Sequence, residues 1–583
     1  MSPDDDFSDD ELHAEYAVAW SLHNLVPFAD KLLGIAGAMD QRPIAAADWY
    51  VRLPLSLVVC VFPTRKDFVA VAHVANVCFW AARMPVVWDY MCWVALTELC
   101  YLCAVLRHRG EASCFMRRAF LPAARALLVT LYASAAFWKL TTSFLTPETS
   151  CATTLVAELA AALFGDTIAT GGAFAKGLMA SAPAQIVAIE VIVPALMVLG
   201  SRAAVPIACL FHFTINLMPV TYAGGFSIAM CARLVIFLPG SLAGGARALR
   251  RAAAEGTDVA DGTAGAALVL AVAAAAYGHA HRGGFDSAGA LFLALAAAYV
   301  RRALFHDDPV EAPASASDAP LRNGAVACGA FYGFAAPILG IMAMASSSMY
   351  GNLRQFDGAW GNHLLVPTGV LQRLAAGADP SKSAFGDAFG GGVVRLERKG
   401  TSGSVFEELY FDADITDEQP PFARELLRDA VPGHPTRYFE FYAARNYFNR
   451  DGDHAETALH NDNGLRATAA TKPAPAPAAL AMPSYELRRA LDLARQRGEP
   501  FSVKYAKLSS KTPSSWRVEK VSKADAISYA FPAGKCRDGN GRACAPDELA
   551  MLPPPPTWLT FLLHPYPVPL LDDGSGDEVH CTT

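Results

Sequence analysis

The chain has 583 residues, of which 53% are hydrophobic and 18% are charged, and its formal net charge at pH 7 is −7. Soluble proteins average about 45–50% apolar and about 25% charged residues, so this composition argues against a wholly soluble chain. The sequence has no basic segment with interleaved aromatic residues, so nucleic acid is not an expected partner.

The excess of apolar residues belongs to the first part of the chain. Long uncharged runs crowd the residues up to 345, whereas the residues from 346 onward have an ordinary soluble composition. Residues 1–16 are acidic and lack the positively charged start of a cleavable signal peptide. We therefore expect a disordered acidic tail over 1–16 and a transmembrane bundle over 17–345, inserted into the lipid bilayer through its own helices.

Runs long enough to span a membrane recur through this bundle. A spanning helix needs about 20 apolar residues, and about 17 at the short end. The sequence predicts a polytopic α-helical membrane bundle of about nine to eleven spans, of which those near 17–37 and 44–63 are interrupted by charges. The clearer candidates are 68–83, 87–106, 120–145, 183–200, 203–222, 226–243, 264–280, 286–304 and 324–345.

The loop charges indicate how the bundle is oriented. Loops 107–118 and 246–262 carry several arginines, whereas the alternate connections 146–151 and 223–225 have neither lysine nor arginine. Cytoplasmic loops of membrane proteins carry the excess of positive charge. The pattern predicts a cytoplasmic N-terminus and a lumenal or extracellular region after 346.

A proline- and alanine-rich stretch divides this water-facing region. Residues 466–482 have the proline density of an extended linker. The flanking parts, 346–465 and 483–583, contain strand-like runs and an amphipathic helix, so a smaller mixed, β-leaning C-terminal region is expected. Cys536 and Cys544 close a short polar loop and are candidates for a disulfide on the extracytoplasmic side, with two free thiols as the alternative.

Signatures of soluble enzymes are missing. The sequence contains no P-loop, dinucleotide-binding fingerprint, zinc-protease helix motif or nucleophile elbow. The stretch 451–462 has three aspartates and two histidines, but their spacing matches no metal site that can be justified. A solvated polar loop is the simpler interpretation, and no metal site is predicted.

Ionisable residues inside the predicted spans carry more information, because such groups are costly in a bilayer and face a cavity or a partner. Lys139 lies near the outer end of the span 120–145. A lysine partly withdrawn from water has its ammonium form disfavoured, which makes the free amine available as a base or nucleophile. The alternative is a lysine whose long side chain reaches the membrane interface.

Other polar residues in the spans suggest partners for such a site. His212 and Asn216 are four residues apart and share one helix face, where they can bind a polar ligand or simply join helices. Glu98 and Glu190 are each alone in an apolar run. They are candidate partners for Lys139 or for another buried cation, with purely structural pairing as the alternative.

Four parts of the chain share a pattern with a known family: Phe137–Cys151, Phe211–Asn216 with Phe226–Ile228, Ser348–Leu365 and Pro483–Arg489. These segments resemble the horizontally transferred transmembrane (HTTM) family, which includes the vitamin K-dependent gamma-carboxylase and many microbial proteins. In that family a membrane helix ends in Lys-Leu, a later helix carries Phe-His…Asn followed by Phe-Ser-Ile, and an Asn-Leu-Arg…Asn-His-Leu stretch follows the last span.

The resemblance implies a carboxylase-like enzyme that depends on a quinone and on oxygen. In the carboxylase the lysine of the Lys-Leu motif deprotonates a reduced, vitamin K-like naphthoquinone, and Lys139 is the matching residue. The expected site therefore has Lys139 and His212 as catalytic side chains. Asn216, Glu190 and Glu98 are expected to bind the substrate or the quinone.

Two other classes of function remain open on the sequence. Residues 141–143 are Thr, Thr and Ser, where the carboxylase has acidic residues after the Lys-Leu motif. In a non-catalytic membrane transporter or scaffold, the Lys139 side chain would only extend to the membrane interface. A receptor-like binding protein would have its function in the outer region.

Overall fold

The structure is a computed structural model. It describes residues 7–33, 48–83, 89–109, 115–147, 150–153, 173–217, 220–244, 273–276, 287–305, 319–340, 361–371, 392–406, 479–507, 526–556 and 568–570, together with the single residues 156, 159, 163, 348, 351 and 353.

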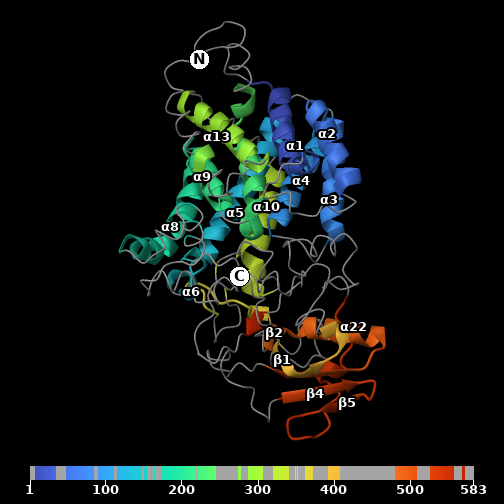
Figure 1. Cartoon of the computed structure of the whole chain (residues 1–583). Coiled ribbons are helices and arrows are strands. Elements are labelled where there is room, and N and C mark those ends of the chain that lie inside the picture. The colour runs from blue at the N-terminus through green and yellow to red at the C-terminus, as the bar shows by residue number, and fades with distance from the viewer. Residues whose placement is uncertain are drawn as a thin grey trace.

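The N-terminal part is mostly helical, as predicted, and its helices form one bundle (Figure 1). A continuous core of buried apolar side chains runs through these helices. They are α1 (Asp9–Leu33), η2 (Asp48–Arg52), α2 (Leu53–Val61), α3 (Lys66–Arg83), α4 (Asp89–Arg107), η3 (Met116–Phe120), α5 (Leu121–Trp138), α6 (Thr142–Leu145), α8 (Ala173–Val198), α9 (Ala204–Asn216), α10 (Val220–Arg233), η5 (Leu234–Ile236), α13 (Ser287–Phe305), α14 (Ala319–Ala330), η7 (Phe331–Ala335) and α15 (Ala336–Leu339).

Helix α1 begins within the tail that was predicted to be disordered, and it corrects that prediction for residues 9–16. Ser8 Oγ accepts a hydrogen bond from Glu11 N at 3.2 Å, and the Glu11 carboxylate accepts one from Ser8 N at 2.9 Å. This reciprocal arrangement is a capping box, which stabilises the first turn of a helix. The Asp9 carboxylate accepts a hydrogen bond from Met116 N at 2.9 Å, so the acidic residues cap and anchor the helix instead of keeping it in solvent.

Within the described residues, four helical stretches are long and apolar enough to cross a membrane, and each overlaps a predicted span. Three shorter apolar helices overlap further predicted spans. The predicted span 264–280 lies almost wholly outside the described residues. The long stretches are Tyr90–Arg107, Met116–Trp138, Ala180–Val198 and Ser287–Leu304, and the shorter ones are Trp49–Val61, Ala204–Asn216 and Gly225–Ile236.

Helix α5 lies in the middle of the bundle, against α4, α8 and α14 (Figure 1). Its close approach to α14 and η7 depends on Gly329 and Gly333, four residues apart. A Cβ atom on Gly329 would lie 3.0 Å from Leu127, and one on Gly333 would lie 2.7 Å from Ser134 Oγ. Glycines at this spacing let helix backbones approach closely. Trp138 Nε1 donates to the Gly333 carbonyl at 2.6 Å, which fixes the last turn of α5.

The C-terminal part contains one six-stranded sheet in the order β5-β4-β3-β1-β2-β6, with antiparallel pairing throughout. It lies at one end of the helical bundle (Figure 1). Its elements are β1 (Val393–Ser402), α18 (Ser404–Phe406), β2 (Ala479–Pro483), α22 (Ser484–Arg497), β3 (Phe501–Lys507), β4 (Ala526–Phe531), β5 (Lys535–Arg537), η9 (Leu549–Met551) and β6 (Val568–Leu570).

This sheet joins the two parts that the sequence divides at 466–482. Strand β1 comes from the first part and pairs with β2 and β3, which follow the proline-rich stretch. Residues 479–482 of the predicted linker are themselves part of β2. Leu487 and Leu491 of α22 pack into the same apolar core as the strands. The mixed α/β character is as predicted, but the strands on either side of the stretch share one sheet and one core.

Candidate functional site

Lys139 occupies the C-cap position of α5, directly after the last helical residue, Trp138. Its backbone N–H donates to the Ala136 carbonyl at 3.2 Å, so the chain turns tightly as the helix ends. Because Trp138 is tied to η7, the base of the Lys139 side chain is held in place.

The Lys139 side chain points to a carboxylate. Nζ lies 2.9 Å from Oε2 of Glu190 on α8, and the two side chains are 7% and 9% exposed. The ring centroid of Phe144, a buried residue on α6, lies 5.9 Å from Nζ. A lysine that extended to the interface would be exposed, whereas this one is buried and paired. Of the two glutamates proposed as partners, Glu190 is the one that contacts Lys139.

A segment from after the bundle covers the motif that contains Lys139. Thr142 N donates to the Asn362 carbonyl, and Leu364 N donates to the Leu140 carbonyl, both at 2.9 Å. Thr141 Oγ1 donates to the Gly351 carbonyl at 2.7 Å. Two of the segments that carry the family resemblance, more than two hundred residues apart, therefore contact each other beside Lys139.

His363 lies in the centre of this contact and was not predicted as a site residue. Its Nε2 lies 2.9 Å from the Phe137 carbonyl, while Nδ1 accepts hydrogen bonds from Leu365 N and Val366 N. These contacts place the proton on Nε2, which donates to Phe137. Burial lowers the pKa of His363 from its ordinary value, and the bond to Phe137 opposes that shift only in part. The signal in the sequence that could have identified His363 is its place in the Asn-His-Leu stretch.

His212 is buried on α9, and it contacts α5 two turns before Lys139. Its Nε2 lies 2.6 Å from the hydroxyl of Tyr132. Tyr132 and Lys139 are seven residues apart, which is about 10 Å along a helix axis. Among the described side chains, no hydrogen bond or ion pair joins His212 to Lys139. Asn216 is also buried, one turn after His212.

Glu98 belongs to a separate polar cluster formed by α1, α3, α4 and α10. Its Oε1 accepts hydrogen bonds from Trp20 Nε1 and Asn76 Nδ2, both at 2.7 Å. Nη2 of Arg233 lies 3.9 Å from the same oxygen. The structure therefore places Glu98 with Arg233, and it does not bring Glu98 to the Lys139–Glu190 pair.

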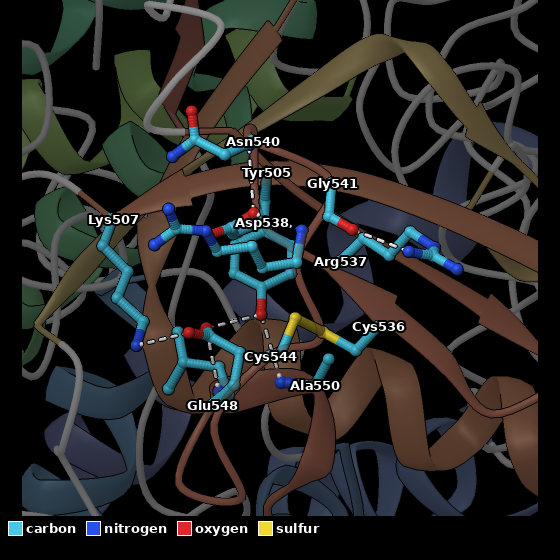
Figure 2. Close-up of a disulfide and its surroundings, with 12 residues drawn as sticks. Tyr505, Lys507, Cys536, Arg537, Asp538, Asn540, Gly541, Cys544, Glu548 and Ala550 are labelled. Carbon is cyan, nitrogen blue, oxygen red and sulfur yellow. Dashed lines mark hydrogen bonds and ion pairs between the residues drawn. A yellow bond between two sulfur atoms is a disulfide. The ribbon is translucent and has the colours of Figure 1, made fainter.

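The C-terminal domain contains the predicted disulfide. Cys536 on β5 and Cys544 in the following turn are bonded (Figure 2). Beside them the Tyr505 hydroxyl donates to Glu548 Oε1 at 2.7 Å and accepts a hydrogen bond from Ala550 N at 3.2 Å. Burial raises the pKa of Tyr505 well above its ordinary value, and the charge of Glu548 adds to that shift. These contacts join β3 to η9 and have a structural role.

Metal ligation finds no support in the part of the chain that the structure covers. Within it, no group of three or more His, Cys, Asp or Glu side chains could hold a metal ion. The polar stretch 451–462, which the sequence suggested is a solvated loop, lies outside the described residues.

A family model described as a domain of unknown function, DUF8388, matches residues 361–561. The match begins at the segment that covers Lys139 and continues through β1 to η9, so it spans the stretch 466–482 and treats both sides as one unit. No curated protein and no solved structure matches the chain. The matching model is not that of the HTTM family, so the resemblance to that family stays a hypothesis.

Proposed function

We propose that the chain is a multi-pass membrane protein whose bundle holds a proton-transfer site, and that Lys139 and Glu190 of this site act on a reduced, lipid-soluble quinone. The observation that carries the proposal is the ion pair between Lys139 Nζ and Glu190 Oε2 at 2.9 Å, with both side chains buried.

A buried lysine–carboxylate pair can exist in two protonation states. Removing two charges from water costs several kcal/mol for each ion. This cost brings the neutral pair, an amine beside a carboxylic acid, closer in free energy to the ion pair. Glu190 can thus accept the proton of Lys139 and leave the amine free. The free amine is then a base inside a low-dielectric site.

The surroundings of Lys139 fit a phenolic hydroxyl as the proton donor. Phe144 provides an aromatic surface near Nζ, and Trp138, the residue before Lys139, is fully buried. When the hydroxyl of a reduced quinone gives its proton to Lys139, the resulting ammonium stabilises the oxyanion by charge. The bound quinone would supply the later oxygen chemistry. The residues of this chain would hold it and remove its proton.

The proposed topology places the Lys139 site at the end of the bundle that meets the C-terminal domain. The four long apolar helices support membrane insertion by length and composition. The disulfide between Cys536 and Cys544 supports a lumenal or extracellular C-terminal domain, because disulfides persist in oxidising compartments.

The second candidate function is a non-catalytic transporter or scaffold. The Glu98 cluster favours it, because Glu98 joins side chains from three other helices without any contact to Lys139. In that case the Lys139–Glu190 pair would serve only to fix α5 against α8.

The experiment that separates the two functions measures oxygen-dependent oxidation of a reduced naphthoquinone by the purified chain in lipid nanodiscs. We expect turnover by the wild type and a loss of about 10²-fold or more in Lys139→Arg, because arginine cannot release its proton. Lys66→Arg is the matched control, since Lys66 also forms an ion pair, with the exposed Asp10 at 3.1 Å, and is itself only partly buried. Wild-type turnover in Lys139→Arg, or none in the wild type, would favour the transporter or scaffold.

A further inference from the structure

Two buried cysteines lie in contact where α9 packs against α10. The Sγ atoms of Cys209 and Cys231 are 3.3 Å apart, with either thiol able to donate a weak hydrogen bond to the other. Both side chains are buried, and each cysteine is free. The sequence suggests only two small apolar residues in separate spans, because nothing in the pattern shows that they meet.

This pair of thiols is next to the polar contact between α9 and α5. Cys209 and His212 are three residues apart on α9, so they lie on the same face. His212 in turn contacts the Tyr132 hydroxyl at 2.6 Å. Tyr132 lies within electrostatic range of both thiols and of Glu190. The dithiol therefore lies near the His212–Tyr132 contact, and Glu190 lies within electrostatic range of Tyr132.

We propose that Cys209 and Cys231 form a redox-active dithiol that a lipid-soluble quinone oxidises to a disulfide. The choice of a quinone rests on the proposed function, whereas the redox pair itself rests on the contact between the two sulfur atoms. No part of the site assigned above includes these cysteines.

The reaction balances in atoms and electrons. Two S–H bonds break and one S–S bond forms, and the two hydrogen atoms, as two electrons and two protons, go to the two oxygen atoms of the quinone. The products are a disulfide and a hydroquinone. A disulfide has a sulfur–sulfur distance of about 2.05 Å, so the two sulfur atoms must approach by roughly 1.3 Å.

The position of the pair determines what can oxidise it. Both thiols are withdrawn from water inside the bundle, which disfavours the approach of a charged oxidant such as glutathione disulfide. An apolar quinone dissolves in the surrounding lipid and is a two-electron oxidant. Oxidation of the dithiol would generate the reduced quinone that Lys139 is proposed to deprotonate, and the new bond would join α9 to α10 beside His212.

The test treats the purified full-length chain with duroquinone under anaerobic conditions. This quinone carries a methyl group at every free ring carbon, so it can accept electrons from thiols without being alkylated by them. Remaining thiols are then alkylated and the digested protein is mapped by mass spectrometry. We expect a Cys209–Cys231 disulfide peptide and one durohydroquinone for each chain.

The variants and a second oxidant make the result specific. Cys209→Ser and, separately, Cys231→Ser should abolish durohydroquinone formation, whereas Cys100→Ser, another buried cysteine in the bundle, should leave it unchanged. The proposal is overturned if Cys209 and Cys231 stay fully alkylatable after duroquinone treatment. It is also overturned if diamide closes the disulfide while duroquinone does not.

Lys139→Ala distinguishes this proposal from the proposed function. The disulfide should still form in that variant, because Lys139 takes no part in thiol oxidation. If the disulfide forms but the Lys139 variants oxidise hydroquinone as fast as the wild type, the proposed function is overturned and the dithiol proposal stands. If hydroquinone oxidation depends on Lys139 but no Cys209–Cys231 disulfide forms, the dithiol proposal is overturned and the proposed function stands.

Discussion

The Nε2–H of His363 donates to the carbonyl of Phe137 over 2.9 Å, across a sequence separation of 226 residues. This bond attaches the segment after the bundle to the last turn of α5, two residues before Lys139. The first and third resemblance segments thus form one local structure. The position of Lys139 depends on both of them.

The pH dependence of stability should report this attachment. The folded-state pKa of His363 lies below its ordinary value of 6.5, chiefly because burial disfavours the imidazolium. Below that ordinary value the unfolded chain binds a proton that the folded chain does not, so stability is complete above pH 6.5 and falls as the pH drops toward the folded-state pKa. Protonation would also make Nδ1 a donor facing the N–H groups of Leu365 and Val366.

His363→Gln is the variant that isolates this effect, because glutamine keeps a donor and an acceptor but does not titrate. Thermal unfolding of wild type and variant would be followed from neutral pH to about pH 5. We expect a steeper fall in the wild-type midpoint than in the variant. Parallel curves would show that His363 does not contribute to the pH dependence.

The Lys139–Glu190 pair should show the energetics of a buried ion pair. Glu190→Gln leaves the ammonium of Lys139 without its counter-charge, and breaking a buried pair in this way costs about 3–5 kcal/mol. The double variant Lys139→Met/Glu190→Leu removes both charges and should recover most of that loss. Denaturant unfolding of the three proteins gives the comparison.

An exposed ion pair is the control for that measurement. Asp10→Asn breaks the pair with Lys66, in which the aspartate is 66% exposed, so its effect should stay within about 1 kcal/mol. If Glu190→Gln and Asp10→Asn cost the same, the Lys139–Glu190 pair is solvated and its role as a buried base is contradicted.

Sequence reasoning identified much of the bundle but not its contacts. Apolar run length is a local property, and it located the four long helices. It also singled out Lys139 and Glu190, because a charge in an apolar run is visible in the sequence. Their pairing, and the separation of Glu98 from them, depends on which helices pack together. The covering segment around His363 depends on a long-range contact that no local pattern encodes.

The C-terminal domain shows the same limit. A proline-rich stretch indicates a linker by composition, but pairing between β1 and β2 across it is decided by the sheet. At the N-terminus the acidic composition suggested disorder, although Ser8 and Glu11 have the spacing of a capping box. That local signal was available and outweighs the composition.

The core of the C-terminal domain should depend on the Tyr505 hydroxyl. Tyr505→Phe removes the hydroxyl that donates to Glu548 and leaves the buried Ala550 N–H without its acceptor, which costs about 1–3 kcal/mol. Tyr529→Phe is the matched control on the neighbouring strand β4, where the hydroxyl has no hydrogen bond among the described residues. Limited proteolysis of the full chain in urea would measure both. Equal protease resistance in the two variants would contradict a structural role for the Tyr505–Glu548 contact.

The proposed orientation should appear in cysteine labelling of sealed vesicles. Arg109→Cys and Lys399→Cys introduce thiols at exposed positions in a basic loop and in strand β1. With the exposed Cys78, Cys103 and Cys328 replaced by serine, a membrane-impermeant maleimide should label only one of the two introduced thiols from the outside. Labelling of both from the same side would contradict the topology.

The central claim is that the free amine of Lys139 removes a proton from a reduced quinone, and chemical rescue of Lys139→Ala tests it most directly. Alanine leaves room for a small primary amine at the position of the lysine Nζ. General-base catalysis contributes about 10²–10⁴-fold, so the loss and its recovery should be measurable. We predict that hydroquinone oxidation by Lys139→Ala rises with added methylamine. It should not rise with added guanidine, which, like the arginine side chain, keeps its proton and cannot act as a base. A variant that methylamine does not rescue, with a Lys139→Arg protein that turns over like the wild type, would contradict the account.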